Sequence, residues 1–383
     1  MASYEHKYLI EKNTRVEIEE CLREFSSKLF ANHSNLQIVS ASGFRSKQGE
    51  IEENSGPCIV LYTSCKGVLP YKEKEFPKCI DGIKTDVREG FFYLFPREKR
   101  NASSKDILNP LRMGASIGRE GDINREGTLG GFVIEEAEST CSGGVQPLYF
   151  LTCAHVLFDT SKGIQSYFPK EEFSVVQPCC GVLADKRNYV CGKHLQSVFP
   201  PEHQEGVTVD ASLVGISARF PKEALFSDLT PMRLYQMGYG EEKPLLYSSG
   251  AYRDYRLNKE HDERNNTCIK VGANTGLTRG LLTVNGITAK YLHGTIIGEP
   301  NTPPGEDYYA QLEITGPGNM VFSQGGDSGA LVFQVDPPKE KGGNDNLVCI
   351  GMIVGGTSYH STVATPICAV LEKLKVQLKK FSE

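Results

Sequence analysis

The feature that most constrains the fold of this chain is a succession of short β-rich segments that begins at Leu129. Each segment is bounded by Gly, Pro, Asn or Asp, which are residues that favour turns. The segments cover residues 131–134, 148–153, 173–177, 211–216, 269–272, 281–284, 308–314, 330–335 and 348–354. Many short strands at such spacing, with turn residues between them, predict an all-β barrel or sandwich.

The first 110 residues have a different pattern. Residues 14–29 place apolar side chains at mostly helical spacing, with Thr14 available as an N-cap, and predict an amphipathic helix. Strand-like stretches follow at 36–41, 58–65 and 83–94. We therefore expect a small α+β domain over residues 1–110. Nothing in it has the pattern of a catalytic site, and the sequence does not decide whether it inhibits, recruits substrate or mediates self-association.

The rest of the chain divides into a linker and one large domain. Residues 111–127 belong to a polar, glycine-containing stretch that is typical of a linker, and the β-rich domain then covers residues 128–383. Within that domain, residues 220–266 are polar, rich in Tyr and charge, and longer than an ordinary connection, which indicates an insertion or a functional loop. The end of the domain predicts a helix, because one stripe is formed by Val370, Leu371, Leu374 and Leu378.

Composition excludes several classes of partner. The 383 residues are 39% hydrophobic and 23% charged, as in ordinary globular proteins. The 42 Lys+Arg and 47 Asp+Glu give a net charge of -5, which predicts neither a nucleic-acid partner nor a membrane partner. The N-terminal segment lacks the pattern of a secretory signal, and no apolar run approaches the length of a membrane span. We expect the chain in the cytoplasm or nucleus.

The twelve cysteines are scattered through a long chain, so free thiols are expected rather than a disulfide framework. One cluster raises the alternative of a zinc site, because Cys179, Cys180, Cys191 and His194 lie close together in sequence. The paired C-x-x-C spacing of structural zinc sites is missing, and adjacent cysteines rarely both point at one metal. We expect no metal there and no organic cofactor.

Three short motifs carry chemistry. His155 stands in Leu-Thr-Cys-Ala-His-Val, Asp210 in Val-Asp-Ala-Ser-Leu, and Ser328 in Gly-Gly-Asp-Ser-Gly. A serine hydroxyl needs a neutral imidazole to take its proton and a carboxylate to hold that imidazole in the right tautomer. Glycines around Ser328 allow the tight turn in which the N–H groups of Gly326 and Ser328 converge on an oxyanion. The predicted catalytic residues are therefore His155, Asp210 and Ser328.

These motifs resemble the T-A-A-H, D-x-A-L and G-D-S-G signatures of trypsin-like serine proteases over about two thirds of the chain. The stretch 270–280 resembles the K-x-G-x-x-T-G-x-T-x-G segment of intracellular and bacterial members, and residues 59–88 and 118–133 are similar to the N-terminal region of that subgroup. The resemblance implies a mainly β, chymotrypsin-like fold of two antiparallel six-stranded barrels with a C-terminal helix, after the α+β domain. It places His155 and Asp210 in the first barrel and Ser328 in the second, with the triad between them.

The resemblance also implies where a substrate side chain binds. By position, the S1 pocket has its floor near Phe322 and Ser323 and its wall at Val354, Gly355, Gly356 and Ala364. No aspartate lies where trypsin carries one, so a Lys or Arg preference is not supported. His360 or Ser323 would favour an acidic or polar residue, and the alternative is that His360 is only a loop histidine.

One departure from the digestive enzymes concerns Asp327. In those enzymes the aspartate before the active serine pairs with a freed N-terminus, but this sequence has no Arg/Lys-Ile-Val-Gly-Gly activation site. An unpaired carboxylate in the wall of the site would be costly. The sequence alone does not identify the group that pairs with Asp327.

Three functions are weighed. The leading one is an active endopeptidase that hydrolyses peptide bonds in a protein or peptide substrate. The second is a latent or regulated protease-fold scaffold that acts as a binding module, against which the complete triad argues. The third is an esterase, which usually presents a G-x-S-x-G serine in the order Ser, acid, His. The order here is His, Asp, Ser, which disfavours it.

Overall fold

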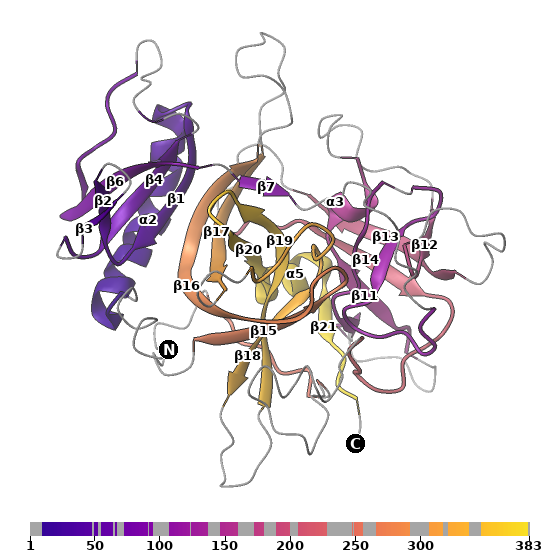
Figure 1. The fold of residues 1–383 in the computed structure, drawn as a ribbon. Coiled ribbons are helices and arrows are strands. Elements are labelled where there is room, and N and C mark those ends of the chain that lie inside the picture. Colours follow the sequence, from indigo (N-terminus) through magenta and orange to yellow (C-terminus); the bar gives the residue numbers. More distant parts are fainter. Residues whose placement is uncertain are drawn as a thin grey trace, which may run out of the picture.

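The computed structural model describes residues 10–47, 50–52, 55–63, 66, 73–90, 92–94, 107–122, 124–136, 146–159, 172–179, 189–199, 206–227, 247, 249–255, 266–291, 306–316, 321–336 and 346–381. In this part of the chain the fold is mainly β, with two large sheets, one of them strongly curled (Figure 1). None of the helices described is long and apolar enough to span a membrane.

The first large sheet has eight strands in the order β21-β10-β11-β14-β13-β12-β8-β9. Its neighbours are antiparallel, and Phe150, Leu151 and Val214 are fully buried on it. The helix α3 (Ala154–Leu157) follows β11 directly. The strands are β8 (Ser116–Arg119), β9 (Gly127–Thr128), β10 (Phe132–Glu135), β11 (Tyr149–Thr152), β12 (Ser174–Val176), β13 (Val190–Val198), β14 (Ala211–Ile216) and β21 (Val376–Leu378).

The second large sheet contains a ring of six strands, because β15 pairs with both β18 and β16. The long strand β16 bends through several register shifts, one of them beside Gly286, whose φ is +102°. Such bulges curl a strand and increase its twist. The six strands are β15 (Thr267–Gly272), β16 (Gly276–Tyr291), β17 (Glu306–Thr315), β18 (Leu331–Asp336), β19 (Asn346–Thr357) and β20 (Ser361–Pro366).

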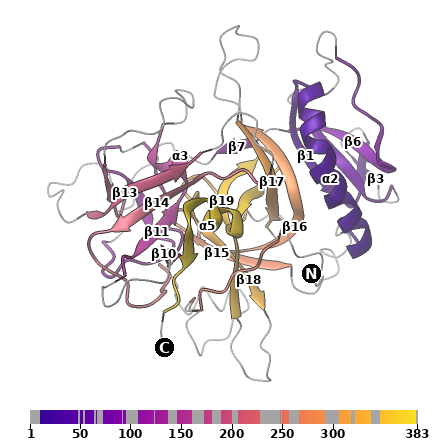
Figure 2. The same cartoon turned by 180° about the vertical axis from the view of Figure 1, so that it is seen from behind.

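The N-terminal unit continues this second sheet. Strand β1 pairs with β16 at Ile38 and Val39, and the sheet extends outward through β4, β6 and β5 (Figures 1 and 2). The predicted helix is confirmed as α2 (Lys12–Asn32), which packs across β16 and β1. The expected α+β domain therefore shares a sheet with the β domain. Its strands are β1 (Leu36–Ser42), β4 (Cys58–Thr63), β5 (Cys79–Ile80) and β6 (Ile83–Glu89), with β2 (Arg45–Lys47) and β3 (Glu50–Glu52) forming a separate pair.

Polar contacts join the N-terminal unit to the ring. The buried carboxylate of Glu313 accepts hydrogen bonds from Ser40 of β1 at 2.5 Å and from Ser361 of β20 at 2.7 Å. The rings of Tyr62 and Tyr359 stack with centroids 4.3 Å apart. Because Tyr359 lies in the turn between β19 and β20, the N-terminal unit supports that hairpin.

The predicted strand at 83–94 is divided in two. Strand β6 ends at Glu89, and a Cβ on Gly90 would lie 2.7 Å from the Tyr62 ring, so only glycine fits where the chain leaves the sheet. The second part is β7 (Phe92–Leu94), which pairs with β16 and β19 instead. One continuous β-rich stretch thus serves two different parts of the fold.

Other segments also differ from expectation. Residues 111–127, expected to be a linker, contain β8 and the first residue of β9 in the first sheet, and Leu111, Met113 and Ile117 are buried. The C-terminal helix α5 (Ile367–Leu374) is shorter than predicted, because Lys375 takes a left-handed conformation and the chain then pairs with β10 as β21. The described residues of 220–266 make two isolated bridges, one between Phe226 and Met113 and one between Tyr252 and Cys349.

Candidate active site

The pairing of β11 with β14 brings His155 to Asp210. Asp210 directly precedes β14, and His155 lies in the single-turn helix after β11, whose last residue Thr152 pairs with Ser212. The His155 Nδ1 and Asp210 Oδ2 atoms are 2.5 Å apart. A carboxylate at Nδ1 holds the proton on that nitrogen and leaves Nε2 free to accept one. Among the described residues, Nε2 has no hydrogen-bond partner.

The Asp210 carboxylate is fully buried and receives several donors. Oδ1 accepts the backbone N–H groups of Ala154 at 2.7 Å and His155 at 3.2 Å. Oδ2 accepts the hydroxyl of Tyr308 at 3.1 Å, in addition to His155. These donors satisfy the oxygens of a carboxylate that has no access to water. Tyr308 was not predicted as a site residue, since it stands in an expected strand about 100 residues away with no motif around it.

Ser328 lies in the turn before β18. Gly326 and Gly329 on either side of it have φ values of +96° and +94°, which side chains rarely adopt. The Ser328 hydroxyl donates to the carbonyl oxygen of Val354 at 3.3 Å and forms no hydrogen bond with His155 in this structure. The exposed fraction is 0% for Ser328 and Asp210 and 3% for His155, so the three residues are covered.

The His155 and Ser328 segments meet at one carbonyl. The oxygen of Ile353 accepts the Cys153 thiol at 3.1 Å and the Gly329 N–H at 2.8 Å. These two donors are neighbours in sequence of His155 and Ser328, respectively. The structure therefore brings the segments of the predicted base and the predicted nucleophile to the same residue of β19.

The turn around Ser328 is held by Thr128. Its hydroxyl donates to the carbonyl oxygen of Gly326 at 2.9 Å, and its N–H donates to the carbonyl oxygen of Ser328 at 2.8 Å. The carbonyl groups of the turn are thus occupied, while the N–H groups of Gly326 and Ser328 have no acceptor among the described residues. Free amides of this kind are what an oxyanion needs.

Asp327 has a cationic partner inside the chain. The Lys270 ammonium lies 3.0 Å from its carboxylate, and both side chains are fully buried. Burial alone would raise the pKa of Asp327, but Lys270, the Thr275 hydroxyl and the N–H groups of Gln324 and Asn274 hold that pKa below its ordinary value. Burial lowers the pKa of Lys270, against the attraction of Asp327. The charge of Asp327 is therefore balanced by a residue of the 270–280 motif.

The predicted S1 residues are all buried. Phe322 and Ala364 belong to a hydrophobic cluster inside the second sheet, and Ser323 bonds with the Thr362 hydroxyl at 2.6 Å. Val354, Gly355 and Gly356 lie in β19, with the two glycines paired to both β20 and β7. His360 is exposed in the turn after β19, as the loop-histidine alternative expects.

The cysteines near these residues are thiols with backbone partners. Burial raises the pKa of Cys153 well above its ordinary value, and its thiol donates to the carbonyl oxygen of Ile353. Cys179 donates to Arg125 and Cys191 donates to Val175. His194 instead bonds with Ser197, and Cys180 lies outside the described residues. The nine cysteines that the structure describes are free.

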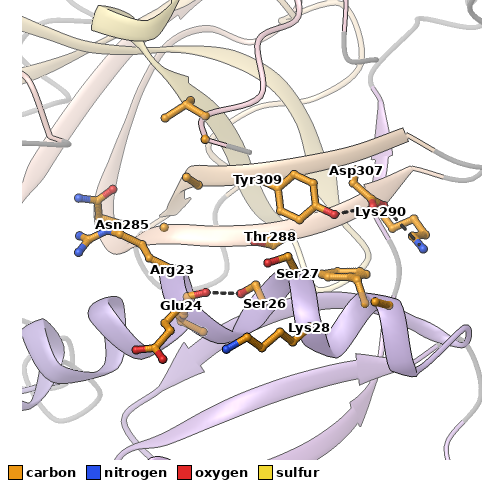
Figure 3. Close-up of a pocket in the computed structure, with 17 residues that line it drawn as sticks. Arg23, Glu24, Ser26, Ser27, Lys28, Asn285, Thr288, Lys290, Asp307 and Tyr309 are labelled. Atoms are coloured by element: carbon orange, nitrogen blue, oxygen red, sulfur yellow. Dashed lines mark hydrogen bonds and ion pairs between the residues drawn. The ribbon is translucent and has the colours of Figure 1, made fainter. Parts of the chain in front are cut away.

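A pocket of about 840 Å³ lies away from the predicted catalytic residues, between α2 and the strands β16 and β17 (Figure 3). Its lining combines both charges with apolar surface, as in Arg23, Lys28, Phe30, Asp307 and Tyr309. It contains none of the predicted site residues.

No protein-family model matches this chain, and no curated protein matches it. Among solved structures it is similar to Thermobifida fusca protease A, with a TM-score of 0.39 and 15% identity over 70% of this chain and 98% of that one. A glutamic-acid-specific serine protease gives 0.39 and 16% over 70% and 100%. Cellulomonas bogoriensis chymotrypsin gives 0.34 and 15% over 70% and 98%. The likeness is a distant one, to serine proteases of the chymotrypsin fold.

Proposed function

We propose that this chain is a serine endopeptidase of the chymotrypsin-like kind, with Ser328 as nucleophile, His155 as general base and acid, and Asp210 as the carboxylate that orients His155. The observation that carries the proposal is the 2.5 Å contact between His155 Nδ1 and the fully buried Asp210, while Nε2 has no hydrogen-bond partner in the part of the chain that the structure describes. A histidine held in this way is suited to accept a hydroxyl proton. We infer two barrels with these residues between them, of which the second is the six-stranded ring and the first is built from strands of the eight-stranded sheet.

The proposed reaction begins when the Ser328 hydroxyl turns from Val354 to His155. Its proton passes to Nε2 as Oγ bonds to the peptide carbonyl carbon, and the oxyanion is held by the N–H groups of Gly326 and Ser328. The tetrahedral intermediate breaks its C–N bond, and His155 gives the proton to the leaving amine. Water then attacks the acyl-enzyme with His155 again as base, which releases the acid and restores Ser328.

The ion pair of Lys270 with Asp327 supports activity without cleavage of a leader. A fixed internal cation holds the residue before Ser328 in place, so no new N-terminus is required to complete the turn. The described cysteines are free thiols, which is typical of proteins in a reducing compartment. We therefore propose that the enzyme acts in the cytosol or nucleus. Its substrate is a protein or peptide.

The N-terminal unit is proposed to act on the same site through the β19–β20 hairpin. It contacts that hairpin by the stacking of Tyr62 on Tyr359 and by the bonds of Glu313 with Ser40 and Ser361. The residues expected to form the substrate wall, Val354, Gly355, Gly356 and Ala364, lie in the two strands of this hairpin. The unit would therefore regulate the enzyme, or respond to a partner, by changing the position of the substrate wall. Self-association is a further role that we propose for the unit.

A second candidate, the latent scaffold, is favoured by the hydroxyl of Ser328 facing Val354 and by the burial of all three catalytic residues. Turnover distinguishes the two. Unfolded casein is incubated with the protein, with Ser328→Ala and with His155→Gln, and peptides are identified by mass spectrometry. New peptides that appear with the unmodified protein alone support the endopeptidase. Equal peptide yields from all three proteins, or none with any, favour the scaffold.

A further inference from the structure

The short strand β7 occupies an edge of β19 next to the predicted nucleophile. It runs antiparallel to β19, with Leu94, Tyr93 and Phe92 opposite Gly355, Gly356 and Thr357. The pairing of β18 with β19 reaches only to Met352, so the edge beyond it is open to another strand. An open sheet edge is where an extended peptide binds by strand addition.

This edge lies beside Ser328. The carbonyl oxygen of Val354, the residue before Gly355, accepts the Ser328 hydroxyl at 3.3 Å. The other side of Gly355 and Gly356 is already paired with β20. A peptide that reached Ser328 by pairing with this edge of β19 would therefore occupy the backbone positions that β7 fills.

The Phe92 side chain anchors β7 near the predicted site. Phe92 is 3% exposed, and its ring meets the rings of Tyr308 at 5.2 Å and Tyr291 at 6.4 Å, edge to face. Tyr308 in turn donates to Asp210. The anchor thus packs directly against a residue that bonds the predicted triad.

We propose that β7 is an internal occupant of the β19 edge at residues 355–357, along which a substrate of the proposed endopeptidase would pair, and that an extended substrate must displace it. The inference rests on the proposed endopeptidase function and adds a way in which that activity is regulated, by the displacement of β7. It also gives a reason for the division of residues 83–94 into β6 and β7, since β7 has to leave the N-terminal sheet to reach β19.

Two matched double variants test the proposal. Tyr93→Pro with Leu94→Pro removes the N–H groups of two successive residues, one of which must face β19, whereas Tyr93→Ala with Leu94→Ala keeps both. The proline variant is expected to hydrolyse a fluorogenic peptide about tenfold faster than the alanine variant, because the competent fraction rises. Equal rates for the proline, alanine and unmodified proteins would overturn the proposal.

Binding separates this inference from the endopeptidase function. In a Ser328→Ala background, a fluorescent peptide Gly-Phe-Phe-Tyr-Leu, copied from residues 90–94, should bind the proline variant more tightly than the alanine variant by fluorescence polarisation. Tighter binding without hydrolysis by the matching Ser328 protein would refute the endopeptidase and retain the peptide edge. Equal binding by the two variants would refute the edge.

Hydrogen exchange on the unmodified protein provides a test that needs no variant. The same peptide at millimolar concentration is expected to accelerate amide exchange at residues 92–94 and to leave β6 unchanged, because only β7 is displaced. Unchanged exchange in β7 at saturating peptide would count against the proposal, even if the proline variant failed to fold.

Discussion

Replacement of Lys270 by methionine tests the most deeply buried charge pair of the site. The ammonium and the Asp327 carboxylate are 3.0 Å apart, with both side chains at 0% exposure. Methionine has a similar length but no charge, so the substitution removes the cation and leaves the carboxylate in place. Asp327 keeps the N–H groups of Gln324, Asn274 and Thr275, which lie at 2.9 to 3.1 Å.

The expected loss follows from burial. Removal of one partner from a buried pair typically costs about 3–5 kcal/mol of unfolding free energy, because an uncompensated charge remains. The surviving N–H donors place the expected loss near the lower end, at about 3 kcal/mol. Without Lys270, burial is opposed only by the hydrogen bonds of Asp327, so the pKa of the folded carboxyl rises relative to that of the unmodified protein. The loss is therefore largest at a pH where the variant's carboxyl is ionised, and it falls as the pH drops and that carboxyl takes up a proton.

The assay is urea unfolding at pH 7.5 and pH 4, on Lys270→Met, on Asp327→Asn and on the double variant. We expect the double variant to be more stable than the sum of the single losses predicts, because it no longer buries a lone charge. A loss below about 1 kcal/mol for Lys270→Met at pH 7.5, or strict additivity in the double variant, would refute the role given to this pair.

Three further predictions concern single side chains. Tyr308→Phe removes one donor to Asp210 and should lower kcat about tenfold with little change in KM, measured by peptide hydrolysis; an unchanged kcat would contradict the role of the hydroxyl. Gly329→Ala places a Cβ 2.5 Å from Thr152 Oγ1 at a φ of +94° and should cost about 2–4 kcal/mol in thermal unfolding, whereas a neutral effect would argue against the turn as described. Glu19 is buried and desolvation raises its pKa to about 7, so stability should fall as pH rises from 4.5 to 7, by up to about 3 kcal/mol. Glu19→Gln should abolish that slope in melting curves, and an equal slope in both proteins would refute the assignment.

Sequence patterns predicted those parts of the fold that depend on residues close together in the chain. The alternation of β-rich runs and turn residues located most of the strands, and apolar spacing located α2 and the start of α5. The motifs around His155 and Asp210 predicted two residues that the β11–β14 pairing brings into contact. In each case the signal lies within a few residues of the feature.

Long-range pairing was not readable from the sequence. Nothing in residues 36–42 indicates that β1 joins β16, whose paired residues lie about 250 positions later. The division of 83–94 depends on the approach of Tyr62 to Gly90, which no local pattern reports. Lys270 was noticed within a motif, but its pairing with Asp327 required the packing of β15 against the turn before β18.

The most direct test of the central proposal is labelling of Ser328 by a fluorophosphonate probe that reacts only with activated serine hydroxyls. Intact-mass analysis compares the unmodified full-length protein with Ser328→Ala and with His155→Gln, which removes the base. The account predicts one covalent adduct per chain on the unmodified protein, mapped to Ser328 and absent from both variants. An adduct that forms on His155→Gln at the same rate would contradict it. So would the absence of an adduct from both the unmodified protein and the variant with Tyr93→Pro and Leu94→Pro.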